Sequence, residues 1–86
     1  MKTFELKNGV IQEASPDSAR YIAKISDGGY ATDAGGFWAS ITAIDGYRCI
    51  SGKIKSPDIY YKILQAYLNN EQVAITEIDM PYEPGI

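Results

Sequence analysis

The chain has 86 residues, of which 45% are hydrophobic and 22% are charged, and its formal net charge is −3. These values exclude an intrinsically disordered protein, which combines low hydrophobicity with high net charge. Eleven acidic against eight basic residues also disfavour a protein whose main task is to neutralise nucleic-acid phosphates or to lie on an anionic membrane. We expect one compact domain over residues 1–80, followed by an extended tail over 81–86.

Cys49 is the only cysteine, so the chain cannot form an internal disulfide. Small secreted domains often carry several disulfides, and their absence favours a reducing compartment. The first residues contain no apolar run of the signal-peptide kind, and no stretch of 18 apolar residues is present to span a membrane. The sequence therefore predicts a cytoplasmic protein without membrane association.

The first predicted element is a β-hairpin. Phe4 and Leu6 alternate with charged neighbours, which is the periodicity of a half-buried strand. The dipeptide Asn8-Gly9 follows and supplies the two positive φ angles of a type I′ turn. A two-residue loop places Leu6 opposite Ile11 as an apolar cross-strand pair.

The next segment fits two kinds of structure. Residues 15–17 (Ser-Pro-Asp) form a helix-start signal, because Ser caps, Pro tolerates the first helical position and Asp complements the macrodipole. One side of such a helix would carry the apolar residues Ala19, Tyr21, Ile22, Ala23 and Ile25, but Tyr21, Ala23 and Ile25 also alternate as in a strand. The capping signal favours a helix that ends at the Asp-Gly-Gly run of residues 27–29. A short edge strand over residues 30–32 then lies between two glycine-rich turns.

A second hairpin is predicted around Asp45-Gly46, another type I′ signal. Its strands are residues 37–44 and 47–54. Counting outward from the turn pairs Ile44 with Tyr47 and Trp38 with Lys53 on one face. The other face pairs Phe37 with Ile54 and Ile41 with Ile50, and it is the more apolar, so we expect it to lie on the core.

The most clearly predicted helix starts at residues 56–58, a second Ser-Pro-Asp triplet, and carries a broad apolar stripe. It ends at Asn69-Asn70, because Asn tolerates the left-handed conformation. Residues 73–78 form the last predicted strand. The predicted order is β-β-α-(β)-β-β-α-β, which indicates an α+β fold with a mostly antiparallel sheet and two helices packed on one face.

The chain contains no histidine, which removes the commonest general base and the commonest metal ligand. Cys49 alone cannot build a zinc site, and as a mid-strand residue it is expected to be a small packing residue. Asp27, Asp33 and Asp45 are expected to bond to local backbone amides rather than to bind calcium. The glycine pairs match no phosphate-binding pattern. We therefore expect a protein that is not an enzyme and that has no metal or cofactor.

Aromatic residues are the unusual feature of the composition: seven Tyr, two Phe and one Trp. Tyr and Trp combine apolar area with a polar group and often anchor interfaces. The predicted partner-binding residues on and beside the central hairpin are Trp38, Tyr47, Ile44, Phe37 and Lys53. An equal alternative is that these aromatic residues only cover the rim of a small core.

The leading hypothesis is a protein-binding module that acts by occupying a larger macromolecular target, in the manner of an inhibitor, immunity factor, antitoxin or phage accessory protein. One alternative is single-stranded nucleic-acid binding on the aromatic sheet face, beside Arg48, Lys53 and Lys55. The acidic balance counts against it. A second alternative is a homo-oligomer, formed through a sheet edge or through the Trp38 face.

Overall fold

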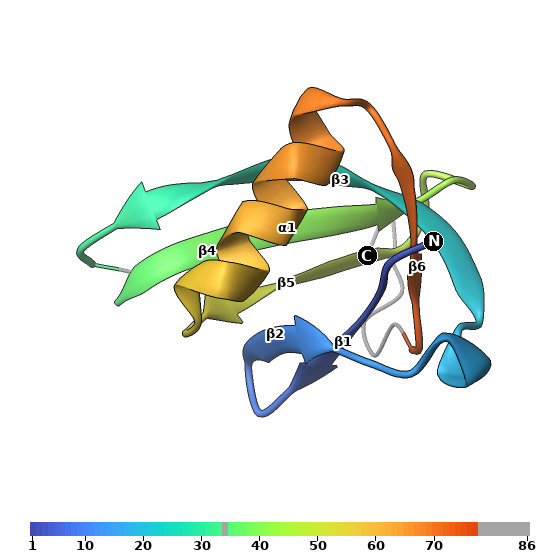
Figure 1. The fold of residues 1–86 in the computed structure, drawn as a ribbon, viewed down its shortest axis with the longest axis horizontal. Coiled ribbons are helices and arrows are strands. Elements are labelled where there is room, and N and C mark those ends of the chain that lie inside the picture. Colours follow the sequence, from blue (N-terminus) through green and yellow to red (C-terminus); the bar gives the residue numbers. More distant parts are fainter. Residues whose placement is uncertain (34, 78–86) are drawn as a thin grey trace, which may run out of the picture.

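The computed structural model describes residues 1–33 and 35–77 (Figure 1). The predicted tail over 81–86 and the predicted strand end at Ile78 lie outside these residues. The described part forms strands β1 to β6, one 3₁₀ turn (η1) and one α-helix. Their bounds are β1 (Thr3–Lys7), β2 (Val10–Glu13), η1 (Pro16–Ser18), β3 (Tyr21–Ala31), β4 (Gly36–Ala43), β5 (Cys49–Ile54), α1 (Pro57–Leu68) and β6 (Gln72–Ile75).

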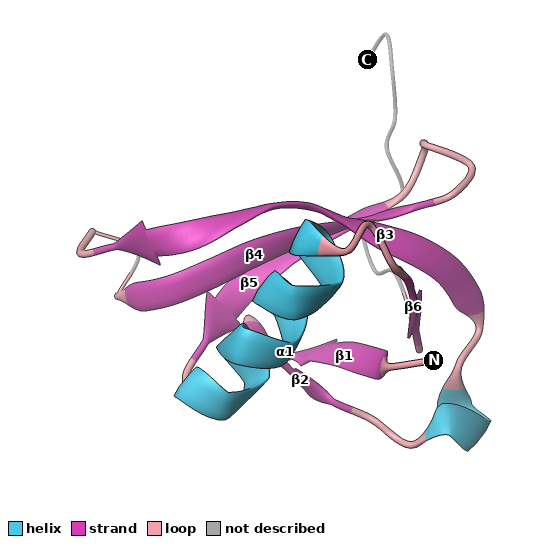
Figure 2. Ribbon diagram, turned by 45° about the horizontal axis from the view of Figure 1, so that its top comes forward, coloured by secondary structure: helices cyan, strands magenta, loops and turns pink. Residues whose placement is uncertain are grey.

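The strands form one mixed sheet that closes into a barrel in the order β1-β2-β5-β4-β3-β6. The β1–β6 and β2–β5 pairs are parallel, and the other pairs are antiparallel. Helix α1 packs on β3, β4 and β5 from one side (Figures 1 and 2). The predicted α+β fold with two helices packed on one face of a mostly antiparallel sheet is therefore wrong, because the described structure is mostly β and contains one α-helix.

The predicted first helix is a strand. The Ser-Pro-Asp signal produces only the single turn η1, in which the Asp17 N–H donates to Ser15 Oγ, and Ala19 is already extended. Beyond it, β3 pairs with β4 on one side and with β6 on the other, which buries Ala23 and Ile25. β4 follows β3 directly and β6 comes from a distant part of the chain. Pairing on both sides outweighs the local capping signal. The predicted edge strand over 30–32 largely coincides with the end of this same strand.

The first hairpin is confirmed. Asn8 and Gly9 have φ angles of 53° and 77°, the positive pair that a type I′ turn requires. Leu6 pairs with Ile11 as the two-residue loop predicts. The local sequence alone thus sets the register of β1 and β2.

The second predicted helix is confirmed as α1. Its end is a Schellman motif: the Asn70 N–H donates to the Tyr67 carbonyl (3.1 Å) and the Glu71 N–H to the Ala66 carbonyl (2.9 Å). Asn70 has a φ of 53°, the left-handed conformation predicted there. No helix in the described ranges is long and apolar enough to cross a membrane.

Replacing Asn70 with glycine should raise the free energy of unfolding by about 0.5–1 kcal/mol, because glycine adopts the left-handed conformation without a Cβ penalty. Asn70→Ala should lower it by about 1 kcal/mol. Urea unfolding of both variants checks this. If both changes destabilised the protein equally, Asn70 would stabilise the fold through its exposed hydrogen bond from Lys24 Nζ to Asn70 Oδ1 (3.2 Å), and not through its backbone conformation.

The core fills the space between the barrel wall and α1. Its fully buried large side chains come from β1, β2, β4, β6 and the helix: Phe4, Ile11, Ile41, Ile63, Val73 and Ile75. A six-stranded barrel is narrow enough for such side chains to occupy its interior. Binding sites must therefore be sought on the outside of the barrel.

Candidate functional site

The predicted register of the central hairpin is confirmed from Phe37↔Ile54 to Thr42↔Cys49. Side chains alternate along β4, so Ala39 and Ile41 face the core and are fully buried. Trp38 and Thr42 point the other way, to the side of the sheet that α1 does not cover. The sequence thus correctly separates the two faces of this hairpin.

Strand β3 widens this second face to three strands. It pairs with β4 through Lys24↔Thr42, Asp27↔Ser40 and Gly29↔Trp38, with a bulge between Ile25 and Asp27. We call the side of β3, β4 and β5 that points away from α1 the outer sheet face. Its side chains are those of Lys24, Ser26, Asp27, Trp38, Ser40, Thr42, Cys49, Ser51 and Lys53.

Hydroxyl groups occupy the middle of the outer sheet face and bond to one another across the strands. Ser40 Oγ lies 2.7 Å from Ser51 Oγ, and Thr42 Oγ1 donates to Ser26 Oγ (2.9 Å). Ser26 Oγ in turn donates to the Ser40 carbonyl (3.0 Å). Cys49, predicted to be a small packing residue, is instead exposed among them. The centre of the face is therefore polar and already hydrogen-bonded, and Asp27 of β3 lies beside it.

Trp38 and Lys53 mark one end of the face, where they pair across β4 and β5. Trp38 is half-buried, and a Cβ added at Gly29 would lie 3.8 Å from its Nε1, so the indole lies over the backbone of β3. The Lys53 Nζ lies beside Gly35, 3.2 Å from where a Cβ would be. The indole is thus held in place by its neighbours rather than extended freely into solvent.

The opposite end is the loop between β4 and β5, and its predicted type I′ turn is wrong. The Gly46 N–H donates to the Ala43 carbonyl (2.8 Å), so the turn forms one residue earlier and the loop spans residues 44–47. Asp45 Oδ1 accepts the Tyr47 N–H (2.9 Å), a side-chain bond that favours this arrangement. Ile44 and Tyr47 are consequently loop residues and do not pair across the strands.

Ile44 and Tyr47 are nevertheless neighbours and are both exposed, to 52% and 66%. The Ile44 N–H donates to the Ile22 carbonyl (3.0 Å), which brings the exposed Ile22 side chain to the same end. Six residues separate Trp38 from Ile44 along the chain, or about 20 Å of extended strand. Four of the five predicted partner-binding residues therefore form two groups at opposite ends of one face: Trp38 with Lys53, and Ile44 with Tyr47.

Phe37 lies on the other side of the sheet. Its ring stacks on Tyr60 of α1, with ring centroids 4.2 Å apart, and Tyr30 contacts it edge-on at 5.3 Å. Tyr61 lies 6.2 Å from Tyr60 and continues the group. Sequence reasoning places Phe37 on the core face but misses this cluster, because it assigns Tyr30 to a separate strand. In the structure, the pairing of Tyr30 with Phe37 across β3 and β4 brings the rings of this cluster together.

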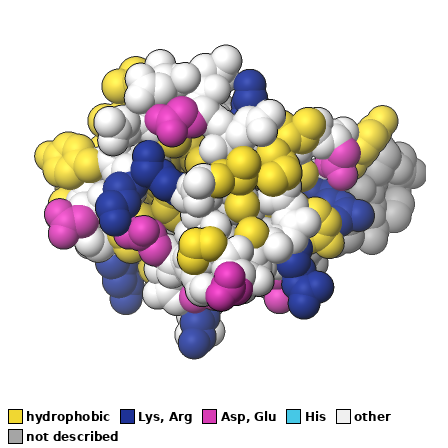
Figure 3. Space-filling model, turned by 45° about the vertical axis from the view of Figure 1, so that its right-hand side comes forward, with side chains coloured by type: hydrophobic (Ala, Val, Ile, Leu, Met, Phe, Trp, Pro, Cys, Tyr) yellow, Lys and Arg dark blue, Asp and Glu magenta, His cyan; other side chains and the backbone are white. Residues whose placement is uncertain are grey.

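Charges of both signs are interspersed on the face of the molecule that Figure 3 shows. Among the described residues, ion pairs join Lys62 to Glu13, Arg48 to Asp45 and Lys2 to Glu71. Arg48 also lies over the Tyr21 ring, 4.7 Å from its centroid. Of the three basic residues expected to favour nucleic acid, Arg48 is therefore already engaged by a carboxylate and a ring.

Two of the aspartates considered in the sequence bond to nearby backbone amides. Asp45 bonds to a loop amide as expected, and Asp27 Oδ1 accepts the Gly28 N–H (2.8 Å) from within β3. Across residues 1–33 and 35–77, no three His, Cys, Asp or Glu side chains gather into a possible metal site.

Comparison of the chain with protein-family models, with curated proteins and with solved structures gives no match.

Proposed function

We propose that this protein is a non-catalytic protein-binding module that acts in the cytoplasm and, like an inhibitor, occupies the surface of a larger macromolecule. The observation that carries the proposal is the outer sheet face. It is three strands wide, α1 packs on the opposite side, and its two ends carry Trp38 and the pair Ile44 and Tyr47.

The chemistry of this face suits a protein partner. Trp and Tyr are the residues that most often dominate binding energy at interfaces. Between them, the hydroxyls of Ser26, Ser40, Thr42 and Ser51 bond to one another or to the backbone, so a partner can cover them without leaving buried groups unsatisfied. The span of about 20 Å between the two ends fits within a standard interface of about 800 Å² per partner.

The same face offers little to nucleic acid. Lys24 and Lys53 are its cations, and Asp27 lies between them on β3. Single-strand binders combine stacking aromatic residues with a groove of clustered positive charge. Trp38 is the only tryptophan, so its fluorescence reports directly on this face. A titratable change in that fluorescence on adding a mixed-sequence oligonucleotide at low salt would favour the nucleic-acid alternative over our proposal.

The proposal predicts that a Trp38→Ala/Tyr47→Ala variant loses its partner. Wild-type protein is cross-linked and captured from cells that produce it, beside this variant and a Tyr30→Ala control. Tyr30 is as exposed as Tyr47 (64% against 66%) but lies on the other side of the sheet. We expect the control to retain the partner and the double variant to bind it more than tenfold more weakly.

Circular dichroism establishes that both variants are folded. If the folded double variant captured the same partner as wild type, the outer sheet face would not be the binding surface. If wild type captured no specific partner, the binding function itself would be contradicted.

A further inference from the structure

Helix α1 has two apolar sides, and the barrel covers only one of them. At 100° per residue, its polar side chains (Asp58, Lys62, Gln65 and Asn69) share one narrow arc. Ile63 and Ala66 are buried against the sheet. Tyr61 and Leu68 lie outside this contact and are 65% and 72% exposed. Tyr67 lies beside Ile25 and Gly28 of β3 and is still 50% exposed. A helix that packs on one surface needs only one such apolar stripe.

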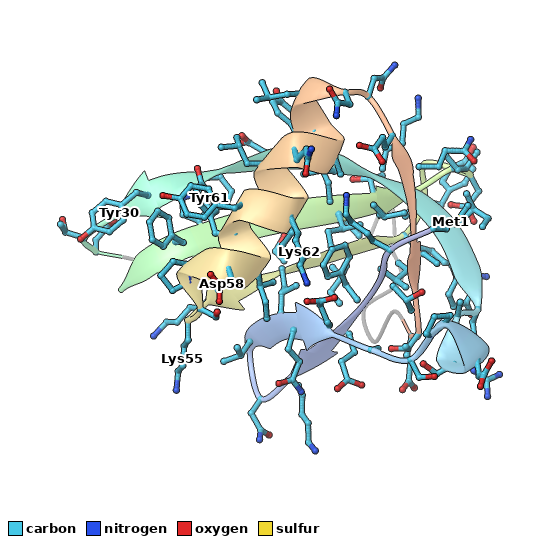
Figure 4. All side chains as sticks on the ribbon, in the orientation of Figure 1. Met1, Tyr30, Lys55, Asp58, Tyr61 and Lys62 are labelled. Carbon is cyan, nitrogen blue, oxygen red and sulfur yellow. The ribbon has the colours of Figure 1, made fainter. Side chains whose placement is uncertain are left out.

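The uncovered side continues onto the sheet. Tyr61 contacts Tyr60, Tyr60 stacks on Phe37, and Phe37 contacts Tyr30, which is 64% exposed. Figure 4 shows Tyr30 and Tyr61 on the same side of α1. We call this patch the tyrosine surface; its members are Tyr30, Tyr60, Tyr61, Leu64, Tyr67 and Leu68.

We propose that the tyrosine surface is a dimer interface that takes a second copy of this chain, with the two α1 helices packed antiparallel. This proposal is independent of the outer sheet face, which lies on the opposite side of the sheet. A dimer built in this way leaves both outer sheet faces free to bind partners.

The exposed area supports a dimer. A large side chain such as Tyr carries about 150–250 Å² of surface, so the four exposed residues Tyr30, Tyr61, Tyr67 and Leu68 present on the order of 450 Å². A specific interface needs about 800 Å² per partner, with an apolar centre and a polar rim. The tyrosine surface thus supplies the apolar centre, and neighbouring polar side chains of α1 supply part of the rim.

The order of residues along α1 favours a second copy over an unrelated partner. Tyr61, Leu64 and Leu68 follow the three- and four-residue spacing with which helices pack side by side. In an antiparallel pair, Tyr61 of each copy meets Leu68 of the other, while Leu64 lies near the two-fold axis. Each aromatic end therefore packs against an aliphatic end. The row contains no charged residue, so two chains of the same net charge bring no like charges together there.

The first test is sedimentation velocity over a concentration series from low micromolar to submillimolar. We expect wild type to shift from monomer to dimer within this range. Leu68→Lys should remain monomeric throughout, because each dimer would bury two ammonium groups. The change should not harm the fold, since a cation suits the last turn of a helix. Tyr47→Ala, which removes an equally exposed tyrosine elsewhere, should dimerise as wild type does.

A second test addresses the orientation of the helices. In a Cys49→Ser background, Tyr61→Cys protein is mixed with Leu68→Cys protein and oxidised mildly. The antiparallel pair predicts that the mixed disulfide dimer forms in excess over either symmetric one. A wild type that is monomeric at all concentrations, or a Leu68→Lys variant that dimerises normally, would overturn the interface. Preferential symmetric cross-links would overturn the antiparallel arrangement.

Discussion

A Gly52→Ala variant is expected to lose about 2–3 kcal/mol of unfolding free energy, because the position has no room for a methyl group. A Cβ there would lie 2.5 Å from Leu6 Cδ1 and 2.8 Å from the Gly9 carbonyl oxygen. The leucine side chain can rotate, but Gly9 belongs to the backbone of the first turn. Its carbonyl accepts the Lys53 N–H (2.9 Å) where β2 meets β5. The added methyl group would push this part of the barrel apart.

Gly29→Ala is the matched control, since it adds the same methyl group to a strand of the same sheet. The nearest heavy atom to its Cβ is Trp38 Nε1 at 3.8 Å, an ordinary contact. We expect its free energy of unfolding, measured in urea, to stay within about 0.5 kcal/mol of wild type. If both changes destabilised the protein equally, the cost would come from replacing a strand glycine in general, and not from the contacts of the new Cβ with Leu6 and Gly9.

The second large effect is expected at Ile63, whose side chain anchors α1 to the barrel and is only 2% exposed. Ile63→Ala should cost about 3 kcal/mol, from lost apolar burial and from the cavity left behind. Leu68→Ala on the same helix removes a side chain that is 72% exposed, and should change stability by less than about 0.5 kcal/mol.

Both helix variants are best compared by chemical denaturation at low protein concentration, where the monomer is the species that unfolds. A cost at Leu68 equal to that at Ile63 would mean that α1 is buried on both sides within one chain. That result would also contradict the proposal that the tyrosine surface is a dimer interface.

Sequence reasoning succeeds here where the signal is local. Asn8 and Gly9 tolerate the two positive φ angles of a type I′ turn, and Asn70 ends a helix because it tolerates the same left-handed conformation. The pairing of Trp38 with Lys53 also follows, because strand periodicity limits which residues share a face. In each case the deciding interactions lie within a few residues of the signal.

It fails where distant segments decide the structure. Tyr21, Ala23 and Ile25 fit a helix and a strand equally well, and the choice depends on β6, some fifty residues further along the chain. The parallel pairs β1–β6 and β2–β5 close the barrel, the latter through Val10↔Lys53. No local sequence pattern predicts these pairs. The error at Asp45-Gly46 concerns only the length of one loop. The dipeptide is compatible with a two-residue loop and with the four-residue loop observed, and the bond from the Tyr47 N–H to Asp45 Oδ1 favours the four-residue loop.

The candidate site is likewise predictable from the sequence only in part. Strand periodicity in the sequence is enough to place Trp38 and Phe37 on opposite faces of β4. The breadth of the apolar stripe on α1 is also visible in the sequence, including Tyr61 and Leu68. Which half of that stripe the barrel covers depends on the angle at which the helix crosses the sheet, and that angle is set by packing against Ile41 and other core residues from several strands.

The position of β1 between β2 and β6 has a consequence for how the chain is made. Thr3 pairs with Ala74, so the barrel closes only when β6 has been synthesised. A nascent chain that has reached the end of α1 has open edges on both β1 and β3, and open edges readily pair with other chains. Contacts between such distant residues also form slowly. The interval in which the ribosome adds α1 and β6 is therefore when this protein is most exposed to aggregation.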